Sequence, residues 1–316
     1  MRGTAGGSLP GDDFRGALTA MAEALPEVLP LPELPARGVS SAMIGRTLGL
    51  INGLDFDLQP AGWRLTQHPD AEHRKGRAQW RHDLDDAEEL LQGFEGTLKV
   101  AVAGPLTLAS TVERPAGDRL LADHGARREL AEALVDGVAT LKGELARRLP
   151  DVQVWLQVDE PALRAVLDGQ IPTASGFSRH RSVKEPEAVE HLKPLAEGAV
   201  LHSCAPGLWL DVARRAGFAG AAVDSRMVDL DELAQWADER RTLILGVVDT
   251  AAAPQSVDQL VDEALRVLRE IQADAGDHLM LGTACGLASW RHSAVVPQLE
   301  ALTRAAALVE ENLARG

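Results

Sequence analysis

The sequence is poor in cysteine, which excludes a fold held together by a framework of disulfides. Only Cys204 and Cys285 occur among 316 residues, and in a reducing compartment such residues are buried, catalytic or metal-bound. No run of 18 apolar residues is present, and the first residues lack the apolar stretch of a secretory leader. These absences predict a cytoplasmic protein that does not enter a membrane.

Positive charge is also scarce. Lys and Arg number 32 against 47 Asp and Glu, and the net charge of −15 repels phosphate backbones and anionic lipid. Neither nucleic acid nor a membrane is therefore expected as a partner. No GxGxxG motif follows an early strand and no GxSxG motif occurs, so a nucleotide loop and a serine hydrolase both lack support.

Short apolar runs alternate with helical patterns along the chain, as parallel strands alternate with helices. A Pro-rich segment at 26–35 is interpreted as a crossover loop, and 67–86 as polar surface. The alternation predicts a single (β/α)₈ TIM barrel over residues 1–316, with a doubly wound open sheet as the alternative. Strands are predicted at about 3–7, 54–59, 98–103, 152–158, 200–204, 220–223, 243–248 and 278–282.

Helices are predicted between these strands from apolar residues spaced three or four apart. In the segment 256–271, Ser256 and Gln259 are placed to form a capping box. The other helices are predicted near 14–25, 41–51, 88–94, 130–145, 185–197, 208–216, 230–237 and after Trp290.

One strand ends in half of a metal site. His202 and Cys204 are two residues apart, so on a strand their side chains emerge from the same face. Zinc prefers nitrogen and sulfur ligands, and Cys285 follows another apolar run. In a barrel, the polar residues at the strand ends converge on one mouth, and here these are Ser8, Asp159, Glu160, His202, Cys204, Asp224, Asp249 and Cys285.

Several motifs resemble the catalytic barrel of the cobalamin-independent methionine synthases. The resemblance covers nearly the whole chain, and its most specific elements have the form QxDEPAL and HxC. The motifs are Gly7-Ser8-Leu9-Pro10, Gly104-Pro105-Leu106-Thr107, the segment Gln157 to Leu163, His202-Ser203-Cys204 and Cys285-Gly286-Leu287.

This resemblance implies a methyltransferase of methionine biosynthesis, in which zinc binds homocysteine and the homocysteine sulfur attacks the methyl group of a folate. Carried over by position, it implies the zinc ligands His202, Cys204, Asp224 and Cys285, of which His202, Cys204 and Cys285 form the catalytic set. It further implies substrate contacts from Ser8, Asp159 and Glu160.

The sequence also departs from the family pattern. Asp224 stands where the family has glutamate, and Asp249 is followed by Thr250 and Ala251 in place of the Ile-His that supplies the family's acid. A folate-stacking tryptophan is missing near Ser110 and Thr111, the glutamate that grips the amino group has no match around 43–46, and the family's second, N-terminal barrel is not seen.

We therefore predict a zinc-dependent methyltransferase acting on homocysteine or a related thiol. The methyl donor is predicted to differ from the usual folate polyglutamate, for example a methylated corrinoid presented by a partner protein. Two alternatives stay open. One is a degenerate barrel that binds zinc or a thiol without turnover. The other is a metal-free decarboxylase like those of the uroporphyrinogen family, although Arg2 and Arg15 are too few for its arginine-rich substrate site.

Overall fold

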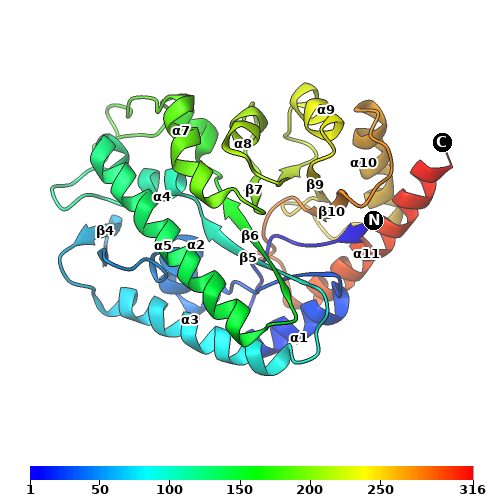
Figure 1. The fold of residues 1–316 in the computed structure, drawn as a ribbon, viewed down its shortest axis with the longest axis horizontal. Coiled ribbons are helices and arrows are strands. Elements are labelled where there is room, and N and C mark those ends of the chain that lie inside the picture. The colour runs from blue at the N-terminus through cyan, green and yellow to red at the C-terminus, as the bar shows by residue number, and fades with distance from the viewer. Residues whose placement is uncertain (316) are drawn as a thin grey trace.

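Eight parallel strands surround a common interior in the computed structural model, which describes residues 1–315 (Figure 1). The strands follow the order β1-β10-β9-β8-β7-β6-β5-β2, and a parallel bridge between Ser8 and Glu33 joins the segments after β1 and β2. The predicted barrel is confirmed. Its strands are β1 (Arg2–Gly3), β2 (Val28–Pro30), β5 (Thr97–Ala103), β6 (Gln153–Asp159), β7 (Val200–Ser203), β8 (Gly220–Asp224), β9 (Thr242–Val248) and β10 (Leu279–Thr283).

Helices cover the outside of these strands. In α10, the buried stripe of Leu260, Ala264 and Leu268 faces the strands, and the predicted capping box of Ser256 and Gln259 is present. None of the helices within residues 1–315 is both long and apolar enough to cross a membrane. The helices are α1 (Phe14–Ala24), α2 (Met43–Leu48), α3 (Ala71–Leu90), α4 (Pro105–Thr111), α5 (His124–Arg148), α6 (Leu163–Leu167), α7 (Glu185–Leu192), α8 (Leu210–Ala216), α9 (Leu230–Asp238), α10 (Val257–Glu270) and α11 (His292–Ala314).

The second barrel strand is not the one predicted. The segment predicted at 54–59 is a strand, β3 (Asp55–Gln59), but it pairs antiparallel with β4 (Gly62–Thr66) in a separate hairpin. The barrel instead uses β2, which lies inside the Pro-rich segment interpreted as a loop. All three residues of β2 are buried. A strand this short, placed between prolines, gives no periodic signal, which is why the prediction was wrong.

The prediction that residues 67–86 form polar surface is also wrong, because most of this segment belongs to α3. Asp70 caps this helix by accepting a hydrogen bond from the backbone N–H of His73 at 2.8 Å. Trp80, Leu84 and Ala87 are buried at helical spacing beneath a charged outer face. The density of charge on that outer face concealed the narrow apolar stripe in the sequence.

A cluster of apolar side chains packs the interior of the barrel, so a ligand can reach only its mouth. Val28, Val200, Ala222, Ile244 and Met280 form one buried cluster contributed by five different strands. In barrels of this type, the active site lies at the carboxyl ends of the strands, above the packed interior. The residues predicted to carry chemistry all lie at those ends.

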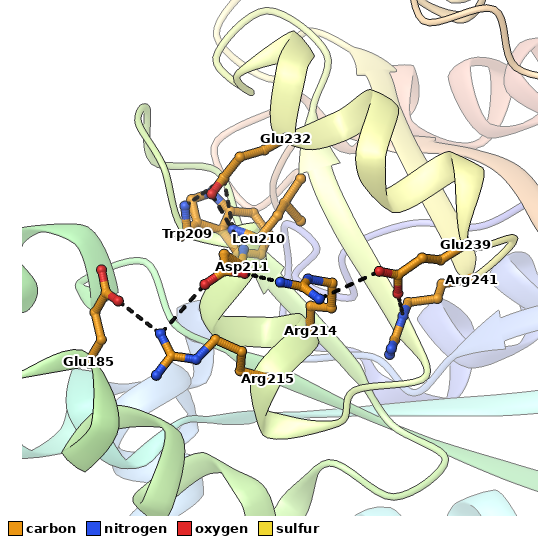
Figure 2. A network of polar contacts seen from close by, with 9 residues as sticks. All are labelled: Glu185, Trp209, Leu210, Asp211, Arg214, Arg215, Glu232, Glu239 and Arg241. Carbon is orange, nitrogen blue, oxygen red and sulfur yellow. Dashed lines mark hydrogen bonds and ion pairs between the residues drawn. The ribbon is translucent and has the colours of Figure 1, made fainter.

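Polar contacts between the outer helices fix the segment that follows β7 (Figure 2). Glu232 on α9 accepts hydrogen bonds from the backbone N–H groups of Trp209 and Leu210, at 2.8 and 2.9 Å, where α8 begins. Carboxylates at a helix N-terminus satisfy its free N–H groups. Arg215 on α8 extends the network to Glu185 on α7 at 2.9 Å. The loop between β7 and α8, which contains Cys204, is thus held at its far end.

Candidate metal and substrate site

β7 places His202 and Cys204 together at the mouth. His202 is buried, and its Nδ1 donates a hydrogen bond to the carbonyl oxygen of Ala222 on β8 at 3.0 Å. This contact fixes the tautomer and leaves Nε2 as the nitrogen with a free lone pair. Cys204 follows two residues later and is half-buried. A histidine held in this way has the arrangement of a metal ligand.

Cys285 lies just after β10 and is 81 residues from Cys204 in the sequence. Its Sγ lies 3.6 Å from Sγ of Cys204, and the ligand atoms of His202, Cys204 and Cys285 all lie within 4.8 Å of one another. Two sulfurs at 2.3 Å from a tetrahedral zinc would be about 3.8 Å apart. Among residues 1–315, this is the one such group of His, Cys, Asp and Glu side chains.

The chemistry of these three donors also fits zinc. The Cys204 thiol donates a hydrogen bond to Sγ of Cys285, and this contact holds the pKa of the Cys285 thiol well below its usual value, against the effect of burial, while it raises the pKa of Cys204. Zinc binds thiolate and neutral imidazole, and a catalytic zinc site has three protein ligands and a fourth position for substrate. These residues therefore match the donor set of a catalytic zinc site.

Asp224 is near this group but not part of it. It ends β8, and its Oδ1 accepts a hydrogen bond from the backbone N–H of Arg226 at 3.0 Å. The Arg226 guanidinium lies 3.5 Å from the same oxygen. Burial raises the pKa of the Asp224 carboxyl group. Its predicted role as a fourth zinc ligand stays a prediction, and the group formed by His202, Cys204 and Cys285 does not depend on it.

A buried carboxylate lies near the predicted site, earlier in the chain than the segment 43–46 in which no glutamate was found. Glu33, after β2, is buried and accepts a hydrogen bond from the hydroxyl of Ser8 at 2.6 Å. Burial raises the pKa of Glu33, and the charges of Asp159 and Cys285 act on it in the same direction. Glu33 was not among the predicted site residues, although it is the single carboxylate within Leu31-Pro32-Glu33-Leu34, which was the available signal.

Asp159 lies beside the metal group. It pairs with His202 across β6 and β7, and Gln157 donates a hydrogen bond to Oδ1 of Asp159 at 2.8 Å. Burial raises the pKa of Asp159, while the charge of His202 opposes this shift. Ser8, Glu33 and Asp159 thus supply one hydroxyl and two carboxylates next to the metal group. Buried carboxylates need a cationic partner, and an ammonium group is one.

A glycine makes room for this arrangement. A Cβ atom on Gly286 would lie 2.6 Å from Cβ of Ser8, closer than side-chain atoms approach. The next residue, Leu287, donates its backbone N–H to the carbonyl oxygen of Ser8 at 2.8 Å. The motif Cys285-Gly286-Leu287 therefore joins the metal group to the segment that carries Ser8.

Comparison with known proteins identifies the family. The family described as "Cobalamin-independent synthase, Catalytic domain" matches residues 92–308, which is more than half of the chain. The chain belongs to the cobalamin-independent synthase family. The predicted resemblance is confirmed, and so is the prediction of a methyltransferase of the methionine-synthase type. The basis for the metal-free decarboxylase alternative is thereby removed.

A solved structure of similar extent shares the fold. It is a B12-independent methionine synthase from Shewanella sp. W3-18-1 in complex with selenomethionine. The match has a TM-score of 0.66 at 15% sequence identity and covers 99% of both chains. No curated protein matches the sequence. At this identity the likeness establishes the barrel, while the family assignment depends on residues 92–308.

Glu160 belongs to the synthase motif QxDEPAL and has a clear structural use. It is fully buried, and its two carboxylate oxygens accept hydrogen bonds from the backbone N–H groups of Leu106 and Thr107, each at 2.8 Å. The Thr107 hydroxyl adds a third at 2.6 Å. These contacts anchor the N-terminus of α4. A role for Glu160 in substrate binding stays a prediction.

The structure of the loop after β9 shows how this chain departs from the synthase pattern. Asp249 accepts a hydrogen bond from the backbone N–H of Ala251 at 2.9 Å, and Trp290 donates its indole N–H to the carbonyl oxygen of Thr250 at 2.8 Å. On α4, the Ser110 hydroxyl donates to the Thr107 carbonyl oxygen at 2.9 Å. The first segment lacks the histidine that supplies the family's acid, and the second lacks the tryptophan that stacks on folate.

A buried lysine beneath the mouth supports Asp159. Lys99 on β5 donates hydrogen bonds to the carbonyl oxygen of Ala5 at 2.7 Å and to Oε1 of Gln157. Gln157 in turn donates to Asp159. Burial lowers the pKa of Lys99 to about 8. Its ammonium group thereby orients the amide that holds the carboxylate of Asp159.

The titration of Lys99 predicts a pH-dependent stability difference between the wild type and Lys99→Met. Between pH 8 and about 10.5, the unfolded lysine keeps a proton that the folded one has lost, so the free energy of unfolding rises with pH. Relative to the variant, the wild type is expected to gain about 3 kcal/mol across this window. Urea unfolding of both proteins at several pH values measures this. A difference that stays constant with pH would contradict the prediction.

Proposed function

We propose that this protein catalyses zinc-dependent transfer of a methyl group to the sulfur of homocysteine. One observation carries the proposal. The compact group of His202, Cys204 and Cys285 lies at the same barrel mouth as the buried carboxylate of Glu33 and the half-buried carboxylate of Asp159. A metal position that binds a thiol and a position that binds an ammonium group would thus be adjacent, and homocysteine carries both groups.

The residues divide into two sets. His202, Cys204 and Cys285 would hold the metal, which when bound lowers the pKa of a coordinated thiol and so supplies thiolate at neutral pH. Ser8, Glu33 and Asp159 would hold the amino-acid end of the substrate. Burial of the Glu33 carboxylate limits the water that could compete for the ammonium group. Together, the two sets fix the sulfur and the amino-acid end at once.

The reaction is a displacement at carbon. The thiolate sulfur forms the new S–CH₃ bond with its lone pair. The bond between the methyl carbon and the donor atom breaks, and the donor atom keeps that electron pair. A folate donor also requires a proton at its departing nitrogen, whereas a methylated corrinoid does not, because its cobalt keeps the pair as Co(I).

The loop after β9 bears on the identity of the methyl donor. That loop contains Thr250 and Ala251 where the family has an Ile-His pair, whose histidine supplies the acid that protonates the departing folate. We propose a donor other than the usual folate polyglutamate, of which a methylated corrinoid is one example. The comparisons with known proteins lend no support to a corrinoid partner, so the donor is decided by assay.

The test is formation of methionine by zinc-loaded protein. Homocysteine is incubated with methyltetrahydrofolate carrying one or three glutamates, or with methylcobalamin, and methionine is measured by mass spectrometry. The expected result is methionine with at least one donor, and a loss of at least about 100-fold in Asp159→Asn, where one charge no longer meets the ammonium group of the substrate. Binding of homocysteine without methionine from any donor would instead establish a thiol-binding barrel without turnover.

A further inference from the structure

An open cavity lies on the outer rim of the barrel, between the start of α5 and the segment that leads into α7. Both helices run back along the barrel from the carboxyl ends of β5 and β6, and they lie side by side (Figure 1). The cavity therefore opens at the end of the barrel that carries the mouth. Its volume of about 460 Å³ is in the range of pockets that hold small organic ligands.

The polar lining of this cavity consists of hydrogen-bond donors. Among the described residues that line it, none carries a carboxylate. The whole chain has a net charge of −15, so its composition alone does not favour such a lining. Surfaces of this kind recognise anions, because the oxygens of an anion only accept. The polar residues of the lining are His124, Arg127, Arg179, His180, Arg181 and Ser182.

Two of the three arginines in the lining have no acidic partner. Arg127 donates from Nε to Oε1 of Glu187 at 2.8 Å, so its charge is compensated. Arg179 and Arg181 are exposed and form no ion pair with any residue from 1 to 315. Both guanidinium groups are therefore free to meet the oxygens of a ligand, which they can bind through paired N–H groups.

A buried histidine lies between these two arginines in the sequence. The His180 side chain is only 5% exposed, and its Nε2 lies 2.9 Å from Oδ1 of Asp118 without the alignment of a hydrogen bond. That oxygen instead accepts from the backbone N–H groups of Arg119 and Ala174, at 2.9 and 3.1 Å. His180 thus brings to the cavity a buried nitrogen that has no hydrogen-bond partner, on a segment that Asp118 ties to the neighbouring loop.

The N-terminus of α5 adds a favourable field. His124 is the first residue of this 25-residue helix and lines the cavity. The N-terminal end of a helix carries a partial positive charge that attracts anions. Asp123 caps the helix through the backbone N–H of Ala126 but does not line the cavity. The field, the free guanidinium groups and the buried histidine therefore meet in one place.

We infer that this cavity binds a small organic anion with two or more negative groups, carboxylates or phosphates, through Arg179 and Arg181. Two free guanidinium groups match two anionic groups, and the volume suits an organic molecule better than a single inorganic ion. The site shares no residue with the metal group, so the inference goes beyond the proposed function and stands apart from it.

The first test uses the unmodified protein. Tricarballylate, with three carboxylates, and 2,3-bisphosphoglycerate are each titrated by calorimetry in about 0.15 M sodium chloride, which screens exposed charges more than about 8 Å apart. At least one is expected to bind with about one molecule per chain, and equally well in zinc-loaded and zinc-free protein. The anion that binds identifies the ligand as a carboxylate or a phosphate. If neither binds, the inference is wrong, whatever the outcome of the methyl-transfer assay.

The second test assigns binding to the two arginines. Arg179→Met and Arg181→Met are each expected to weaken binding of that anion about 10-fold, since each removes a charged donor that is partly screened by solvent. Arg179→Lys, which keeps the charge but not the paired N–H groups, should recover part of the loss. Arg147→Met is the matched control, because Arg147 is exposed at the other end of α5. An unchanged affinity in the double methionine variant, or an equal loss in Arg147→Met, would refute the inference.

Discussion

Replacement of Cys285 by serine is expected to remove zinc and methyl transfer together. Serine is not deprotonated near neutral pH and offers oxygen where zinc prefers thiolate sulfur. Structural zinc sites bind with about 10–16 kcal/mol in total, so the loss of one of three protein ligands should weaken binding by at least about 100-fold. Zinc per chain, measured by atomic emission on protein purified without chelator, tests this directly.

Two further variants make that result specific. Cys204→Ser should behave like Cys285→Ser, because both sulfurs belong to the same compact group. Ser203→Ala is the matched control, because Ser203 is the buried neighbour of Cys204 and lies outside the group. It should keep about one zinc per chain. A wild type without zinc, in which both cysteines are freely alkylated, would rule out the metal site.

The second large effect is on stability. Glu160→Ala is expected to lower the free energy of unfolding by about 3–5 kcal/mol, because three buried donors at the start of α4 lose their acceptor at once. Removal of the Glu160 side chain also leaves a cavity. The site is tightly packed, because a Cβ atom added to Gly104 would lie 2.3 Å from Oε1 of Glu160. Urea unfolding followed by circular dichroism measures the change.

An exposed glutamate provides the comparison for that experiment. Glu129→Ala, on the outer face of α5, should change the free energy of unfolding by less than about 0.5 kcal/mol. If Glu160→Ala costs no more than this control, the hydrogen bonds to α4 do not anchor the helix. In that case, the substrate-binding role predicted from sequence would become the better account of Glu160.

The metal group was predictable because its signal is local. A histidine and a cysteine two residues apart on a strand share a face whatever the rest of the fold does, and a chain with one other cysteine leaves few choices for the third ligand. The barrel was predictable for a similar reason. Most of its strands are apolar runs separated by amphipathic helices, each recognisable within its own segment.

The substrate side was harder to predict because it depends on how the barrel closes. β2 has only three residues among prolines, so neither the strand nor Glu33 beyond it stood out. The position of Asp224 likewise reflects a contact with the backbone N–H of Arg226, which depends on the turn after β8 and cannot be read from a motif.

The contact between the Ser8 segment and the Gly286-Leu287 turn has a consequence for the order of folding. Ser8 lies near the start of the chain and Leu287 near its end, yet their backbones are hydrogen-bonded at 2.8 Å. Contacts so distant in sequence form late and slowly, since a long loop must close first. During synthesis, the segment up to and including Cys285 must leave the ribosome before Cys285 can join Cys204. The binding site is therefore expected to be among the last parts of the protein to assemble.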